Sequence, residues 1–109
     1  PEIPSDTLAL DVLSAGMQMA AEVPVILVNE PMLVSEGKNS DIRYNYYYPR
    51  WVYDQYRQIL GATCEAEGWT CLDLWDAVPQ EFFTNSAIHR SPQGEQLFAL
   101  RLIESGILP

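Results

Sequence analysis

Apolar residues recur at helical spacing near the start of the chain. One face of the predicted helix carries four of them: Leu8, Val12, Ala15 and Met19. Either Ser5 or Asp6 is suited to cap this helix, because both side chains can accept a hydrogen bond from a first-turn amide. We expect the helix to run to about Ala21.

A short apolar run without alternation follows the first helix. Val25–Val28 comes directly after Pro24 and is rich in β-branched residues. The absence of alternation is typical of a parallel strand that is covered on both faces. Polar side chains, Asn29 and Glu30, then follow the carboxyl end of this predicted strand, ahead of Pro31.

The segment from Met32 to Pro49 is first polar and then strongly aromatic. Residues 35–41 carry the polar part, and residues 42–48 carry four tyrosines. A loop of this length inside a small domain often binds a ligand or acts as a lid. Packing of the tyrosines onto the body of the domain is the competing interpretation.

A second helix is predicted from Pro49, with Gly68 as its stop. Five residues mark its apolar face: Val52, Tyr56, Ile59, Leu60 and Thr63. The next apolar run, Thr70–Leu74, predicts a second strand.

The last helix has clear signals at both ends. Ser91 is a suitable N-cap and Pro92 a favoured first helical residue. The pattern continues towards Ser105, and Gly106 and Pro109 end it.

The order helix, strand, helix, strand, helix predicts an α/β fold. We expect a three-layer, flavodoxin-like parallel sheet with crossover helices. We expect residues 1–109 to be either a single domain or the C-terminal part of a larger domain. Because a two-stranded sheet leaves both edges unpaired, we expect a missing N-terminal part or a companion chain to complete it. The start at Pro1, without a methionine, leads us to expect a processed piece.

Composition narrows the range of partners. The 15 acidic residues against 6 basic ones give a net charge of −9, which argues against nucleic acid and anionic membrane surfaces. No apolar stretch is long enough to span a membrane, and the first residues lack the regions of a signal peptide. A hydrophobic content of 48% supports a packed core.

Two cysteines, Cys64 and Cys71, flank the predicted end of the second helix. They provide too few ligands for zinc, and we expect neither a metal nor a cofactor. We predict two reduced thiols, with a disulfide in an oxidising compartment as the alternative.

His89 is the only histidine, and it lies between the second predicted strand and the last helix. Histidine is the side chain that most readily exchanges a proton near neutral pH, and α/β enzymes keep catalytic loops after their strands. His89 is therefore the main candidate for a general base.

The last third of the chain resembles the C-terminal block of SGNH (GDSL-type) hydrolases. The resemblance rests on these segments: Gly68-Trp69, Leu72-Asp73-Leu74-Trp75, Phe83-Thr84-Asn85-Ser86-Ala87-Ile88-His89 and Ser91-Pro92-Gln93-Gly94. In that family an aspartate commonly precedes the catalytic histidine by three residues, and a helix with an early glycine follows. The element order fits about the second half of the family's domain.

The resemblance implies an ester hydrolase or acyl transferase in which His89 is the base. Ser86 stands where the family has its aspartate, with Asn85 beside it, and either side chain could orient the imidazole but not supply a negative charge. The family's Gly-Asp-Ser nucleophile block is missing from the chain. Three residues at or after the first strand's end are candidates for contacts to an ester or acyl substrate: Asn29, Glu30 and Arg43.

Two other functions compete with this one. Asn29-Glu30-Pro31 is similar to the acid/base motif of retaining glycosidases, although the chain is too short for their barrel. The second alternative is a non-catalytic interaction module with Tyr44–Tyr48 as its contact surface, which is consistent with the absence of a nucleophile.

Overall fold

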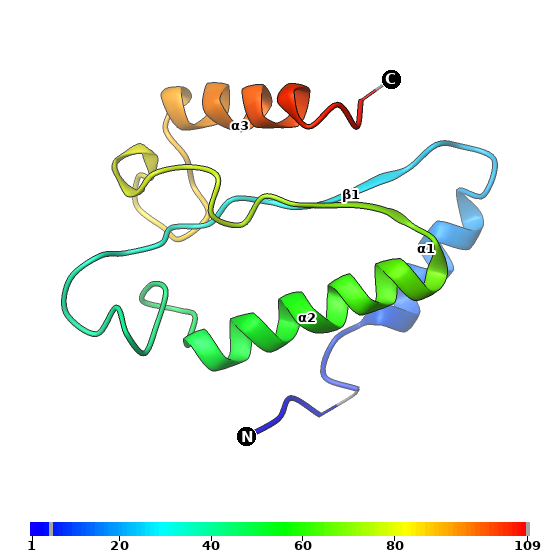
Figure 1. The fold of residues 1–109 in the computed structure, drawn as a ribbon, viewed down its shortest axis with the longest axis horizontal. Helices are drawn as coiled ribbons and strands as arrows, with labels where there is room; N and C mark the ends of the chain where they lie inside the picture. Colours follow the sequence, from blue (N-terminus) through cyan, green and yellow to red (C-terminus); the bar gives the residue numbers. More distant parts are fainter. Residues whose placement is uncertain (5, 109) are drawn as a thin grey trace. The chain divides into compact units, whose positions relative to one another are not determined.

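The computed structural model describes residues 1–4 and 6–108 and has the predicted mixed α/β order (Figure 1). The helices are α1 (Leu10–Met19), α2 (Arg50–Glu67) and α3 (Pro92–Glu104), with a 3₁₀ turn, η1 (Gln80–Phe82), before α3. The strands β1 (Ile26–Asn29) and β2 (Thr70–Asp73) pair in parallel as a two-stranded sheet. The predicted α-β-α-β-α order is therefore confirmed.

The chain divides into two compact units. One contains Pro1–Val28 and Trp51–Leu72, and the other contains Asn29–Arg50 and the chain from Asp73 onward. The division falls inside both strands, so the carboxyl ends of β1 and β2 belong to the second unit together with the loops that follow them. The predicted site residues 85, 86 and 89 also belong to this second unit.

Helix α1 differs from its prediction at its start. It begins at Leu10, and its N-cap is Ala9, whose methyl side chain cannot accept a hydrogen bond from the first turn. Asp6 is therefore not the cap, and Ser5 lies outside the described residues. Ahead of the helix, the Thr7 amide donates to the Pro4 carbonyl at 3.0 Å. The expected apolar face is open: Val12 and Met19 are 67% and 90% exposed.

Helix α2 ends as predicted at Gly68, and the reason is visible in its backbone. Gly68 adopts φ +70°, a conformation that glycine tolerates best. The Trp69 amide donates to the Cys64 carbonyl (3.0 Å) and the Gly68 amide to the Glu65 carbonyl (3.3 Å), which is the Schellman arrangement. This turn reverses the chain and leads directly into β2.

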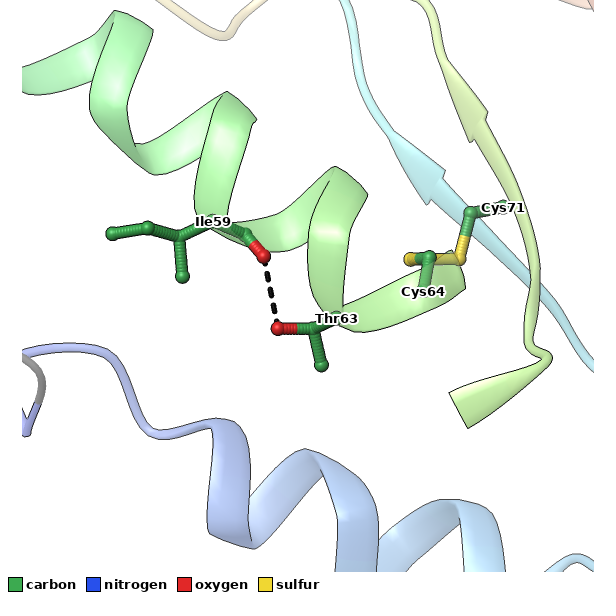
Figure 2. The surroundings of a disulfide bond; sticks show 4 residues. All are labelled: Ile59, Thr63, Cys64 and Cys71. Carbon is green, nitrogen blue, oxygen red and sulfur yellow. Dashed lines mark hydrogen bonds between the residues drawn. A yellow bond between two sulfur atoms is a disulfide. The ribbon is translucent and has the colours of Figure 1, made fainter. Parts of the chain in front are cut away.

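The same reversal overturns the prediction of two free thiols. Cys64, in the last turn of α2, is joined to Cys71 of β2 by a disulfide, with Cα atoms 6.3 Å apart (Figure 2). The sequence separation of 7 closes a small loop across the Gly68 turn. In Figure 2, Thr63 lies one residue before the bridge and donates its hydroxyl to the Ile59 carbonyl at 2.8 Å.

Strand β1 is less covered than its uniform apolar pattern predicts. All four of its residues are partly exposed, and none is buried on both faces. The buried residues of the second unit come mainly from the segments after the strands: Pro31, Met32, Tyr44, Asn45, Val78 and Ala87. The best-packed part of this unit therefore lies beside the loops that carry the candidate site.

Candidate active site

The loop that carries His89 is closed at its base by backbone pairing. Phe83 and Arg90 form an antiparallel bridge, and the Ser91 amide donates to the Phe82 carbonyl at 2.8 Å. Inside this bridge the Thr84 amide donates to the His89 carbonyl, also at 2.8 Å. The backbone on both sides of His89 is thus fixed, although its side chain is exposed.

Ser86 holds the turn of this loop. Its Oγ accepts hydrogen bonds from the amides of His89 (3.1 Å) and Ile88 (3.3 Å). Serine commonly satisfies nearby amides in this way. The hydroxyl oxygen is therefore engaged by the backbone rather than by the imidazole.

Asn85 is the residue that meets the imidazole. Its Oδ1 lies 3.2 Å from His89 Nδ1. An amide oxygen can only accept a hydrogen bond, so this contact places the proton of a neutral ring on Nδ1 and leaves a lone pair on Nε2. Of the two candidates for orienting the ring, the geometry selects Asn85.

Arg90 fastens this loop to the end of β1 and to α3. Its side chain is only 7% exposed, and its Nη1 donates to the Pro31 carbonyl at 2.9 Å. Its Nη2 meets Glu30 Oε2 and its Nε meets Glu95 Oε1, each at 3.1 Å. The guanidinium also lies 4.8 Å from the ring centre of Phe98. One cation therefore connects three separate segments next to His89.

Gly94 allows α3 to approach the loop closely. A Cβ at this position would lie 2.7 Å from the Phe82 carbonyl oxygen and 3.0 Å from Arg90 Cβ, so only glycine fits without movement. Ser91 caps α3 as predicted, accepting from the Gly94 amide at 3.2 Å, and Pro92 is the first helical residue. This is the physical role of the early glycine noted in the sequence.

The three proposed substrate contacts are placed differently. Asn29 donates through Nδ2 to Asp73 Oδ1 at 3.0 Å, which links the carboxyl ends of β1 and β2. Glu30 is paired with Arg90 and so supports the His89 loop from β1. Arg43 lies 5.7 Å from the ring centre of Tyr46, in the tyrosine-rich loop, and the structure brings it together with neither strand-end residue.

The tyrosine-rich loop is organised by Asn45, which sequence reasoning did not select. Asn45 is 2% exposed; its Nδ2 donates to the Leu33 carbonyl at 2.8 Å. Its Oδ1 accepts from the amides of Tyr47 (2.9 Å) and Tyr48 (3.1 Å). A buried polar group must be bonded in this way to be tolerated, and here it fixes a turn.

The tyrosines themselves have two different environments. Tyr44 is buried, with its ring centre 4.9 Å from that of Trp75 in an edge-on arrangement, so it cannot belong to a contact surface. Tyr46 and Tyr47 are 82% and 65% exposed, with their ring centres 5.8 Å apart. Packing therefore describes Tyr44, whereas Tyr46 and Tyr47 are open to solvent.

Within residues 1–4 and 6–108, no group of three or more His, Cys, Asp or Glu side chains is placed to hold a metal ion. In the same part of the chain, no helix has the length and apolar character needed to cross a membrane.

Comparison with known proteins leaves the candidate site to be interpreted from its own geometry. No family model, curated protein or solved structure matches the chain.

Proposed function

We propose that this chain supplies the histidine base of an SGNH-like active site that hydrolyses esters or transfers acyl groups. The observation that carries the proposal is the contact between Asn85 Oδ1 and His89 Nδ1. It holds the neutral imidazole in the tautomer that a general base needs, with the Nε2 lone pair available. The exposed position of His89 leaves that nitrogen open to a substrate or to a second segment.

In the proposed reaction, Nε2 of His89 takes the proton from a serine hydroxyl as its oxygen attacks the acyl carbon. The imidazolium continues to donate its Nδ1 proton in a hydrogen bond to Asn85 Oδ1, and it returns the Nε2 proton to the leaving alcohol. Water then repeats the sequence and releases the acid. Asn85 orients the ring but carries no charge, so it stabilises the imidazolium less than a carboxylate would.

The serine comes from outside this segment in the proposed mechanism. Among the described residues, His89 has no serine hydroxyl in contact with its ring, and Ser86 is committed to backbone amides. We therefore expect the chain alone to hydrolyse short aryl esters no faster than its His89→Ala variant. A clear His89-dependent turnover by the chain alone would contradict an external nucleophile.

The decisive experiment uses the complete reading frame that contains this segment. We expect a fluorophosphonate probe to label one serine, and we expect His89→Ala to lower kcat/KM for aryl esters by about 10²–10⁴-fold. Arg101→Ala is the control, because Arg101 pairs with Glu104 at the exposed end of α3, away from the loop. Unchanged activity in His89→Ala would refute the proposal.

The tautomer can be tested on this chain directly. Long-range ¹H–¹⁵N spectra should show the neutral imidazole protonated at Nδ1, and Asn85→Ala should shift the ring towards protonation at Nε2. A wild-type ring already protonated at Nε2 would remove the observation on which the proposal depends.

A second candidate function is favoured by the tyrosine-rich loop. Asn45 fixes a turn that exposes Tyr46 and Tyr47, and rigid exposed tyrosines are effective contact residues because they lose little entropy on binding. In this alternative, the chain is an interaction module. Sedimentation velocity of the wild type against a Tyr46→Ser/Tyr47→Ser variant tests self-association through this surface; identical profiles with a monomeric wild type would count against it.

The glycosidase alternative requires Glu30 as its acid/base, but Glu30 is paired with an arginine. Glu30 is held by Arg90 as part of the support of the His89 loop. A retaining glycosidase needs this glutamate facing a second carboxylate at about 5 Å across a sugar. We do not propose that activity.

A further inference from the structure

The His89 loop contains an Asn-Ser pair whose hydrogen bonds differ from those of the other Asn-Ser pair in the chain. Two Asn-Ser pairs occur in the chain, Asn39-Ser40 and Asn85-Ser86. A small residue after asparagine lets its backbone nitrogen attack the side-chain amide carbon. The two pairs have the same residue types, so any difference in their chemistry comes from the structure around them.

The attacking nitrogen is engaged in one pair and not in the other. The Ser40 amide donates to the Gly37 carbonyl at 3.2 Å, in a turn where Asn39 adopts φ +67°. In the part of the chain that the structure describes, the Ser86 amide donates to no acceptor, backbone or side chain. Attack at Asn39 requires a hydrogen bond to be broken first, whereas attack at Asn85 does not.

The side-chain amide of Asn85 is also activated by its surroundings. Its Oδ1 lies 3.2 Å from His89 Nδ1 and 3.3 Å from the Thr84 hydroxyl. Donation of a hydrogen bond to this oxygen draws electrons from the amide carbon and stabilises the oxyanion that forms during attack. Asn85 is exposed, so water can reach the intermediate.

We propose that Asn85 is a site of spontaneous deamidation whose aspartate product pairs with His89. The Ser86 nitrogen loses its proton and bonds to the Asn85 amide carbon, and the bond from that carbon to the side-chain nitrogen Nδ2 breaks. Nδ2 leaves as ammonia, taking up the equivalent of the proton that Ser86 lost. A water molecule then opens the resulting succinimide ring at either carbonyl. One opening yields aspartate at position 85; the other yields isoaspartate, in which the backbone runs through the former side chain.

The two products have opposite consequences for the loop. Aspartate keeps the backbone and places a carboxylate oxygen where the amide oxygen stood, 3.2 Å from Nδ1 in the present geometry. A charge-assisted hydrogen bond of this kind is stronger than a neutral one and stabilises an imidazolium. Isoaspartate adds one carbon to the backbone, which displaces Ser86 from the amides that it caps.

The modification stands apart from the proposed enzyme activity, and only its catalytic effect rests on the proposed function. If His89 is a general base, aspartate at position 85 supplies the charge that the resembled family provides with its own residue. We then expect Asn85→Asp, the homogeneous equivalent of that product, to raise kcat of the complete protein by about tenfold.

The test follows both asparagines in the same sample of the purified chain during incubation at neutral pH. Peptide mass spectrometry measures amide-to-acid conversion at each site, and cleavage before aspartate separates it from isoaspartate. We expect conversion at Asn85 to exceed that at Asn39 by about fivefold, the factor equivalent to the roughly 1 kcal/mol of one hydrogen bond. Equal or faster conversion at Asn39 would overturn the proposal.

Ser86→Thr is the matched variant. Threonine keeps a hydroxyl oxygen to accept from the His89 and Ile88 amides, while its branched Cβ hinders closure of the succinimide ring. We expect slower conversion at Asn85 and no change at Asn39, and an unchanged rate at Asn85 would overturn the proposal. The kcat of Asn85→Asp is measured separately, in the complete protein. If Asn85 converts faster than Asn39 but Asn85→Asp has the kcat of the wild type, the catalytic role of His89 is contradicted and the deamidation proposal stands.

Discussion

Replacing Arg90 with methionine tests whether this one side chain holds the His89 loop in place. Arg90 is 7% exposed, and its loss leaves the carbonyl of Pro31, a buried residue, without its donor. An unsatisfied buried acceptor costs about 1–3 kcal/mol. The lost cation–π contact to Phe98 adds about 1 kcal/mol.

The two carboxylates add little to this cost. Glu30 and Glu95 are 51% and 55% exposed, so water replaces Arg90 around them, and each ion pair contributes less than about 1 kcal/mol. We therefore expect Arg90→Met to lower the free energy of unfolding of the second unit by about 3 kcal/mol. With a urea dependence typical of a small domain, the midpoint should fall by about 2 M.

The assay is urea unfolding followed by circular dichroism, with Arg101→Met as the control. Arg101 also pairs with a glutamate, but its side chain is 41% exposed, and such a surface pair is worth about 0.3–0.5 kcal/mol. Arg90→Lys should lie between the two, because an ammonium group cannot meet three separate partners in the same geometry. Equal losses for Arg90→Met and Arg101→Met would refute the role given to Arg90.

Three further predictions address packing, redox state and assembly. Gly94→Ala should lower the free energy of unfolding by about 1–3 kcal/mol in urea unfolding, because the added Cβ would lie 2.7 Å from the Phe82 carbonyl oxygen. Gly61→Ala is the control: a Cβ there meets no atom within 4 Å, and the substitution in α2 should raise the free energy of unfolding by about 0.5–1 kcal/mol. The Cys64–Cys71 bridge should block alkylation until it is reduced, and reduction should cost about 2.5 kcal/mol by the loop-closure estimate; alkylation of both cysteines without reductant would contradict the bridge. Sedimentation should show self-association of the isolated chain, driven by exposed apolar residues of α1 and α3 such as Met19 (90%) and Ile103 (65%), and a stable monomer would argue against the need for a companion.

Local sequence determined the elements of this protein and most of their ends. Gly68 stops α2 because the Schellman turn needs a residue at positive φ, and the amides that close it belong to Gly68 and to Trp69 beside it. Ser91 and Pro92 start α3 because capping depends on atoms within one helical turn. The apolar runs of β1 and β2 were found to within one residue at each end. These features are readable because their causes lie within a few residues of one another.

Tertiary structure decided which side chains meet across the chain. Arg90 bonds to Glu30, which lies 60 residues away in the sequence, and Asn45 bonds to the Leu33 carbonyl. The partners that make the buried guanidinium and the buried amide tolerable are therefore brought in by the tertiary structure, and no local sequence pattern identifies them. The start of α1 was predicted wrongly, since the helix begins at Leu10 and the Thr7 amide is bonded to the Pro4 carbonyl instead of to a cap. The thiols were predicted wrongly because pairing depends on a Cα separation of 6.3 Å, which is a property of the folded backbone and not of spacing in sequence.

The candidate site combines both kinds of information. His89 could be selected from the sequence, because it is the only histidine and precedes a capped helix. The choice of Asn85 over Ser86 as its partner could not, since both lie within four residues and either has an oxygen to offer. The folded loop distinguishes them, because Ser86 Oγ accepts hydrogen bonds from two backbone amides whereas Asn85 Oδ1 contacts the imidazole.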